Sequence, residues 1–127
     1  MIEEFRDVKG YEGIYQASNY GNIKSLNRIV KHSKGGNRVV SERVLSQSVT
    51  TNGYLKVTLA RSGKNRTFKI HQLVAMVFLN HKPNGQVLVV DHIDNDKNNN
   101  RLDNLQIITQ RENASKDKKG YSSKYVG

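Results

Sequence analysis

The chain has 127 residues, and its 21 Lys and Arg outnumber its 11 Asp and Glu, for a formal net charge of +10. This length allows one domain, or one domain with an appendage, and a hydrophobic content of 35% predicts a modest core. No apolar run approaches the roughly 18 residues that a membrane span needs. The absence of cysteine excludes a disulfide scaffold, a cysteine nucleophile and thiolate-bound zinc.

The positive charge is concentrated in the middle of the chain. Between Glu12 and Asp91 the only acidic residue is Glu42, whereas Lys and Arg occur there twelve times. Such a segment favours a polyanionic partner, above all nucleic acid, over a merely well-solvated surface. A lipid surface is the weaker alternative, because no amphipathic helix with a basic face accompanies the charge. We therefore expect no membrane association.

Taken in chain order, residues 13–28 predict two short strands around a turn at 18–22, where Ser, Asn and Gly gather. Residues 29–48 are basic, and we expect them to be irregular, with a turn at Gly35-Gly36. The N-terminal part is therefore expected to be rich in short strands.

The clearest periodicity follows. Apolar and polar side chains alternate over residues 54–60 and 67–70 around a turn at 61–65, which predicts a hairpin with one buried face and one basic face. Apolar residues then recur at helical spacing, which predicts a short helix over His71–Leu79. His71 itself either contacts a phosphate or packs within the fold, whereas we expect His81 to face solvent.

The C-terminal half predicts two strands, Val87–Val90 and Leu105–Thr109, on either side of the polar stretch Asp91–Asn104. A Thr-x-x-Glu capping box at the end of the second strand predicts a helix from about 110 to 116. Residues 117–127 are expected to be a linker or the beginning of a further, truncated unit.

Three interpretations of the polar stretch compete. It could be a turn-rich loop without chemistry, since Asn and Asp satisfy their own backbones well. A calcium loop of the EF-hand type is a poor match, because Asn99 and Leu105 stand where Gly and Glu are needed. In a hydrolytic metal site, the adjacent Asp91 and His92 would point to opposite sides of a strand, one holding a cation and the other acting on water.

The residues of this stretch closely resemble the HNH nucleases. Those that carry the resemblance are Asp91-His92, the Asn run, Asn104-Leu105 and Asn113. Upstream, residues 71–78 resemble the segment that precedes the motif in phage and intron-encoded HNH homing endonucleases. Residues 10–21 resemble their nuclease-associated DNA-binding motif. The matched blocks occur in family order within residues 5–116.

The resemblance implies an α+β fold of small antiparallel sheets and hairpins with a C-terminal ββα-metal module. It divides the chain into an N-terminal DNA-binding motif with a basic linker (1–52), a nuclease domain (53–116) and the start of a truncated C-terminal DNA-binding domain (117–127). The family usually has Gly at the position of Asn95, and we expect Asn95 to adopt the left-handed conformation that Gly would supply.

The resemblance also assigns roles in the site. Asp91 and Asn113 would bind one divalent ion, Mg²⁺ or Mn²⁺, with no small-molecule cofactor. His92 would be the general base, because imidazole accepts a proton near neutral pH. Asn104 would orient His92 or the loop that carries it.

The implied function is metal-dependent endonucleolytic hydrolysis of double-stranded DNA, giving 5′-phosphate and 3′-hydroxyl ends. One site per chain implies nicking by a monomer or weak dimer, in the cytoplasm of a bacterial host and compatible with a phage gene. A non-catalytic DNA-binding or regulatory protein is the alternative. Six basic residues are expected to contact DNA, although those at the hairpin turn fit a merely solvated tip equally well; they are Lys24, Arg28, Arg61, Lys64, Arg66 and Lys69.

Overall fold

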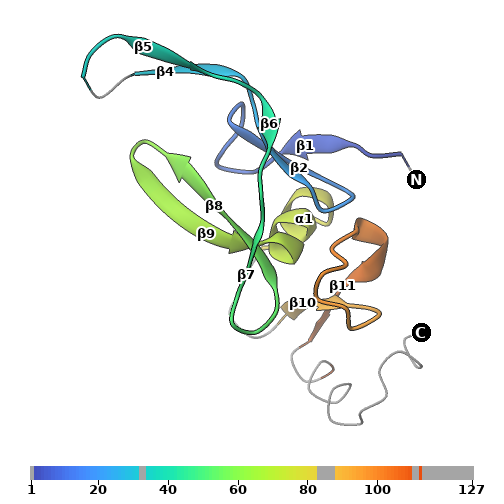
Figure 1. Cartoon of the computed structure of the whole chain (residues 1–127). Helices are drawn as coiled ribbons and strands as arrows, with labels where there is room; N and C mark the ends of the chain where they lie inside the picture. The colour runs from blue at the N-terminus through green and yellow to red at the C-terminus, as the bar shows by residue number, and fades with distance from the viewer. Residues whose placement is uncertain (1, 32–33, 83–87, 110–111, 113–127) are drawn as a thin grey trace.

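In the computed structural model of the chain, short antiparallel strands surround the helix α1 (Ile70–Phe78) (Figure 1). The structure describes residues 2–31, 34–82, 88–109 and 112. The α+β class with small antiparallel sheets and hairpins, expected from the sequence, is confirmed. In the described ranges no helix is long and apolar enough to cross a membrane.

The N-terminal sheet has four antiparallel strands in the order β1-β2-β3-β6. The two strands predicted around residues 18–22 are present, and β1 and β6 extend them on either side. The strand β1 was not predicted, because its three residues are too few to show a period. The bounds are β1 (Phe5–Asp7), β2 (Tyr15–Ser18), β3 (Ile23–Ser25) and β6 (Arg43–Val44).

A two-stranded hairpin, β4 (Arg28–Lys31) with β5 (Asn37–Val40), projects from this sheet (Figure 1). The expectation that residues 29–48 are irregular is therefore wrong, although the turn at Gly35-Gly36 is confirmed by two positive φ angles. The hairpin escapes a periodicity argument because neither face is fully buried. Ile29 and Val39 pair with each other and are 68% and 71% exposed, and Val30 and Val40 on the other face are only half-buried.

The third sheet has the order β7-β8-β9, and its bounds are β7 (Ser48–Val49), β8 (Leu55–Arg61) and β9 (Lys64–Lys69). The predicted hairpin is confirmed, but the prediction that its basic residues lie on one face only is wrong. Arg66 lies opposite the fully buried Leu59, so it shares the core-facing side, whereas Lys56 pairs with Lys69 on the other side. The core covers only part of this face, so its outer end carries charge.

The helix α1 (Ile70–Phe78) follows β9 directly and confirms the predicted change of period. Asn80 has φ +54°, and the amide of His81 donates to the carbonyl of Ala75, which ends the helix. His81 is only 8% exposed, so the expectation that it faces solvent is wrong. The chain folds back at this point and buries a residue that its polar neighbours would place outside.

One hydrophobic core joins the N-terminal sheet, the β8-β9 hairpin and α1. Leu73 and Val74 of the helix are fully buried in it, and Leu105 reaches it from the C-terminal half. The core therefore draws on both sides of residue 52, and the predicted domain boundary there stays a prediction. The buried members are Val8, Tyr15, Ala17, Ile23, Val57, Leu59, Ile70, Leu73, Val74 and Leu105.

The C-terminal half contains an antiparallel pair, β10 (Leu88–His92) and β11 (Leu105–Thr109), with a short 3₁₀ turn η1 (Leu102–Asn104) leading into β11. Both predicted strands are confirmed. The capping box after β11 is confirmed as well, because the Thr109 amide donates to the Glu112 carboxylate and the Glu112 amide donates to the Thr109 hydroxyl. Other residues of the predicted final helix lie outside the described ranges.

Candidate active site

The register of the β10-β11 pair determines what surrounds Asp91. Asp91 lies opposite Gln106, and the Gln106 amide Nε2 donates to Asp91 Oδ2 over 2.8 Å. Asp91 is 7% exposed although it carries a carboxylate. A buried carboxylate needs polar partners or a cation, so its position at the end of β10 suits an ion ligand.

The next residue, His92, joins a different set of side chains. Its ring lies 4.8 Å from the ring of His71 and 6.0 Å from that of Tyr54, measured between centroids. Its Nε2 lies 2.7 Å from Oδ1 of Asn100. His92 and Asn100 are 5% and 4% exposed. The two neighbours Asp91 and His92 thus meet separate partners, as alternation along a strand requires.

His71 is a packing residue at the start of α1. It is 5% exposed, and its Nδ1 has no hydrogen-bond partner among the described residues. Burial, together with the nearby His92 and Lys69, lowers the pKa of His71 to about 3. A neutral, enclosed imidazole does not attract a phosphate, so the packing interpretation of His71 holds.

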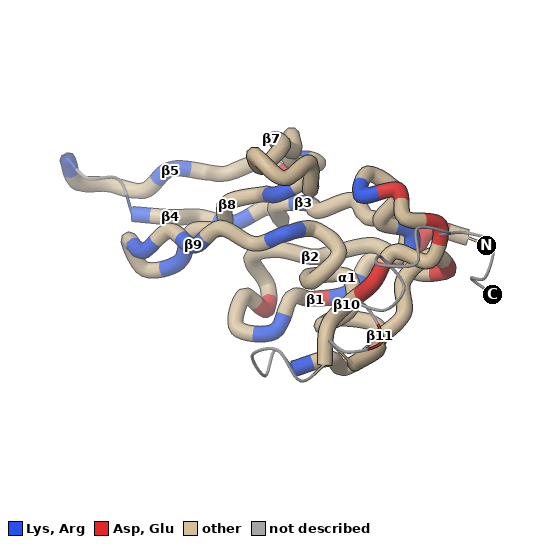
Figure 2. The backbone as a smooth tube through the Cα atoms, turned by 90° about the horizontal axis from the view of Figure 1, so that it is seen from below, with Lys and Arg blue, Asp and Glu red and all other residues tan. Residues whose placement is uncertain are grey.

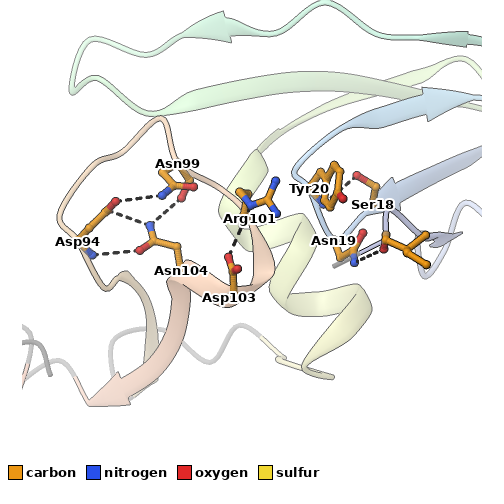
Figure 3. A network of polar contacts seen from close by, with 9 residues as sticks. Ser18, Asn19, Tyr20, Asp94, Asn99, Arg101, Asp103 and Asn104 are labelled. Atoms are coloured by element: carbon orange, nitrogen blue, oxygen red, sulfur yellow. Dashed lines mark hydrogen bonds and ion pairs between the residues drawn. The ribbon is translucent and has the colours of Figure 1, made fainter.

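Asn104 holds the loop between the two strands (Figure 3). Its amide donates to Asp94 Oδ1 and to the carbonyl of Asn99, and its oxygen accepts from the Asp94 amide, at 2.9, 2.9 and 3.1 Å. Although desolvation opposes it, hydrogen bonds from Asn99, the Asp96 backbone and Asn104 lower the pKa of Asp94. Asn95 has φ +63°, which confirms the expected left-handed conformation.

The N-terminal sheet contacts the same loop. The amide of Leu102 donates to the carbonyl of Asn19 over 2.8 Å. The guanidinium of Arg101 lies over the Tyr20 ring, 4.2 Å from its centroid, and Figure 3 shows these two side chains together between the loop and the β2-β3 turn. Two segments some 80 residues apart in the sequence are therefore in contact at this loop.

The donor chemistry at Asp91 fits a hard divalent cation, which prefers oxygen ligands. The second predicted ligand, Asn113, lies outside the described residues. Within the described part of the chain, no three or more His, Cys, Asp or Glu side chains come together as a metal site. A site with one carboxylate and one amide from the chain would leave several coordination positions for water and phosphate.

Several basic residues lie at the outer end of the β8-β9 hairpin (Figure 2). Arg61, Lys64 and Arg66 at the outer end of the β8-β9 hairpin line a groove of about 770 Å³ together with Lys9 and Tyr11. Arg61 donates to the carbonyl of Gly10. Figure 2 shows lysine and arginine along the β4-β5 and β8-β9 hairpins. We refer to Arg61, Lys64 and Arg66 as the basic edge.

The other three predicted DNA contacts lie elsewhere. Arg28 shares a second groove with Arg61, and it also donates to the Ser25 hydroxyl over 2.9 Å. Lys24 pairs with Glu42 at 3.6 Å, so part of its charge is already neutralised. Lys69 places its Nζ 4.7 Å from the centroid of the Tyr54 ring, beside the histidine cluster.

Three residues that shape the site were not singled out by sequence. Asn100 is one of three consecutive asparagines, and nothing in the sequence distinguishes it from Asn98 or Asn99. Tyr54 lies 38 positions before His92, so only folding brings the two together. Gln106 could have been found by pairing the two predicted strands, because it lies directly opposite Asp91.

Known proteins match the chain over both halves. Residues 3–60 match the NUMOD4 motif, and residues 69–115 match the HNH endonuclease family. The chain is 38% identical over 111 residues to DNA endonuclease I-HmuI of Bacillus phage SP01, across 87% of this chain and 55% of that protein. It is 30% identical to H-N-H endonuclease F-TflII of Escherichia phage T5, across 91% of this chain and 52% of that protein.

A solved structure, described as DNA binding and cleavage by the HNH homing endonuclease I-HmuI, superposes with a TM-score of 0.69 at 35% identity. The superposition covers 96% of this chain and 63% of that one. The chain thus spans about half the length of these two phage relatives.

Proposed function

The chain belongs to the HNH family of homing endonucleases, and from this we propose that it is a metal-dependent endonuclease that hydrolyses phosphodiester bonds of double-stranded DNA. The observation that carries the proposal is the adjacent placement of Asp91 and His92, both buried, at the end of β10. Asp91 offers oxygen to a cation, while His92 presents an imidazole to water on another side of the strand.

In this mechanism His92 accepts the proton of the attacking water, since an imidazole is basic near neutral pH. Asp91 and Asn113 would hold one Mg²⁺ or Mn²⁺ ion. When bound, such an ion supplies charge neutralisation at the scissile phosphate and the departing 3′ oxygen. Asn104 keeps the loop between β10 and β11 closed through its bonds to Asp94 and Asn99.

The products of this reaction are a 5′-phosphate and a 3′-hydroxyl. One site per chain cuts one strand, so we propose nicking by a monomer, with double-strand cleavage requiring a second chain. The basic edge and the β4-β5 hairpin would bind the duplex through its phosphates, which position a protein without specifying sequence. We place this activity in the cytoplasm of a bacterial host, where phage DNA is found.

The test uses supercoiled plasmid and a duplex that contains the target site. With Mg²⁺ the chain should convert supercoiled plasmid to the nicked form, and EDTA should abolish the conversion. His92→Ala and Asp91→Ala should each lose cleavage while DNA binding, followed by fluorescence anisotropy, changes little. Asn98→Ala is the matched control, because Asn98 is exposed in the same loop.

Two results would contradict the proposal. Nicking that persists in EDTA would remove the metal from the mechanism. Cleavage that is undiminished in His92→Ala would remove the general base. A chain that binds DNA tightly but never cuts, with any divalent ion, would instead support the DNA-binding alternative.

A further inference from the structure

We propose that Asn100, held by the β2-β3 turn, is a positioning residue that keeps His92 in the tautomer with its proton on Nε2. This inference rests on the proposed function, in which His92 accepts a proton from water. It explains which ring nitrogen of His92 accepts the proton of water. When Nε2 is protonated, the lone pair is on Nδ1, so Nδ1 is the acceptor. It also gives the N-terminal sheet a role in cleavage besides contact with DNA.

The first step is the contact between His92 and Asn100. The amide oxygen of Asn100 lies 2.7 Å from Nε2 of His92, and both residues are at least nine-tenths buried. An amide oxygen only accepts hydrogen bonds, so the ring nitrogen that faces it must donate. In a neutral imidazole one nitrogen donates and the other accepts, so this contact selects the Nε2–H tautomer.

The second step is the support beneath Asn100. Gly21, in the β2-β3 turn, has φ +90°, and a Cβ atom built on it would lie 3.1 Å from both the Cβ and the carbonyl oxygen of Asn100. Only glycine permits this close approach and this backbone angle together. The turn is itself held, because the Gln47 side chain donates to the Gly21 carbonyl over 2.9 Å.

Two further contacts secure the chain on the C-terminal side of Asn100. The Leu102 amide donates to the Asn19 carbonyl, and Arg101 lies over the Tyr20 ring (Figure 3). The turn thus contacts Asn100 and the two residues that follow it. A displacement of the turn would be transmitted to the amide oxygen that faces His92.

Asn104 acts at a different point. Its side chain binds Asp94 and the carbonyl of Asn99, the residue immediately before Asn100. It closes the loop, while Asn100 provides the oxygen that faces the imidazole. Asn100 and the β2-β3 turn therefore position the base directly, whereas Asn104 acts only through the loop that contains Asn100.

The test reads the tautomer directly, by NMR of ¹⁵N-labelled histidine rings in the metal-free protein, with His92→Gln to assign the signal. The wild type should show His92 protonated on Nε2. Gly21→Ala introduces the Cβ that meets Asn100, and it should produce a mixture of tautomers. It should also lower kcat for nicking by about 10- to 100-fold, with a smaller change in KM, because small misplacements of a reacting group cost that much.

Gly13→Ala is the matched control. Gly13 has φ +77°, so the substitution introduces comparable backbone strain, but a Cβ there meets nothing within 4 Å. It should leave the His92 tautomer as it is in the wild type. Asn100→Leu is the second variant, which removes the acceptor and keeps a similar shape, and it should also mix the tautomers.

The outcomes separate this inference from the proposed function. The inference is overturned if wild-type His92 is protonated on Nδ1, or if the tautomer is unchanged in both Gly21→Ala and Asn100→Leu. A Gly13→Ala variant whose His92 tautomers are mixed as in Gly21→Ala also overturns it, because backbone strain alone would then explain the effect. If the tautomers behave as expected but the wild type never cleaves DNA, the proposed function fails, whereas the positioning of His92 by Asn100 stands.

Discussion

The imidazole rings of His71 and His92 lie 4.8 Å apart, with their planes inclined by 56°. Tyr54 packs against both rings, and Lys69 and Lys97 each place an Nζ 4.7 Å from the centroid of the Tyr54 ring. Two imidazoles at this separation cannot both be charged without strong repulsion. His71, whose pKa is lowered by burial and by the nearby His92, stays neutral, and this limits the pH range in which the folded state is stable.

We expect the stability of the chain to fall in acid because of His71. The pKa of this residue drops from 6.5 to about 3 on folding, so below pH 6.5 the unfolded chain binds a proton that the folded chain does not. Stability attributable to His71 is therefore present above pH 6.5 and declines as the pH falls toward 3, by up to about 1.4 kcal/mol per pH unit. Urea unfolding at pH 7, 6 and 5 measures this slope.

His71→Leu is the comparison for that slope, since it fills a buried position with a group that does not titrate. As the pH falls from 7 to 5, the unfolding free energy of the wild type should decrease relative to that of the variant. Curves for the two proteins that run parallel from pH 7 to 5 would show that His71 is not held neutral by the fold.

Asn104→Ala should open the loop between β10 and β11. The substitution removes three side-chain hydrogen bonds to Asp94 and Asn99 and leaves part-buried groups unpaired. We expect a loss of about 1–3 kcal/mol in unfolding free energy and faster hydrogen exchange at the Asp94 amide. Asn98→Ala, at an exposed position of the same loop, should stay within about 0.5 kcal/mol of wild type.

Neutralising the basic edge should weaken DNA binding and its dependence on salt. If each of Arg61, Lys64 and Arg66 meets a phosphate, the triple change to Gln should reduce the slope of log K against log salt by about 3. Titrations between low and moderate salt measure it. Lys24→Gln is the comparison, because Lys24 already pairs with Glu42, and its effect on the slope should be well below 1. Equal effects at both places would contradict the assignment.

Leu73→Ala should destabilise the whole chain and not one half of it. Leu73 is fully buried in a core that reaches from Val8 to Leu105. A loss of about 2–5 kcal/mol is expected for such a cavity, in one unfolding transition seen by both circular dichroism and tyrosine fluorescence. Leu79→Ala, with Leu79 38% exposed, should cost about 1 kcal/mol or less. Two separate transitions in wild type would show that the halves fold independently.

Local patterns in the sequence were sufficient for the elements that carry strong periodicity or capping signals. The hairpin over residues 54–70 and the helix that follows it have apolar residues at regular spacing, because each buries one side against the core. The β4-β5 hairpin was missed for the opposite reason. Neither of its faces is fully buried, so burial imposes no clear alternation on its sequence.

In the candidate site, too, some residues can be recognised from the sequence and others only from the structure. Asp91 and His92 are recognisable because they are adjacent in the chain, end a strand and lie in the segment that matches the HNH family. Their surroundings come from distant segments: Tyr54, His71 and Asn100 meet His92, and Gly21 meets Asn100. Spacing along the chain contains no information about such contacts.

The charge of the chain also shows what sequence alone cannot determine. Composition alone indicates a polyanionic partner, since twelve basic residues and one acid occupy the segment between Glu12 and Asp91. Which of these residues act together depends on strand register and on neighbouring acids, which bring Arg61, Lys64 and Arg66 into one groove and pair Lys24 with Glu42. Chemistry that resides in neighbouring residues can be read from the sequence, whereas chemistry that needs a precise distance between remote residues is set when the core closes.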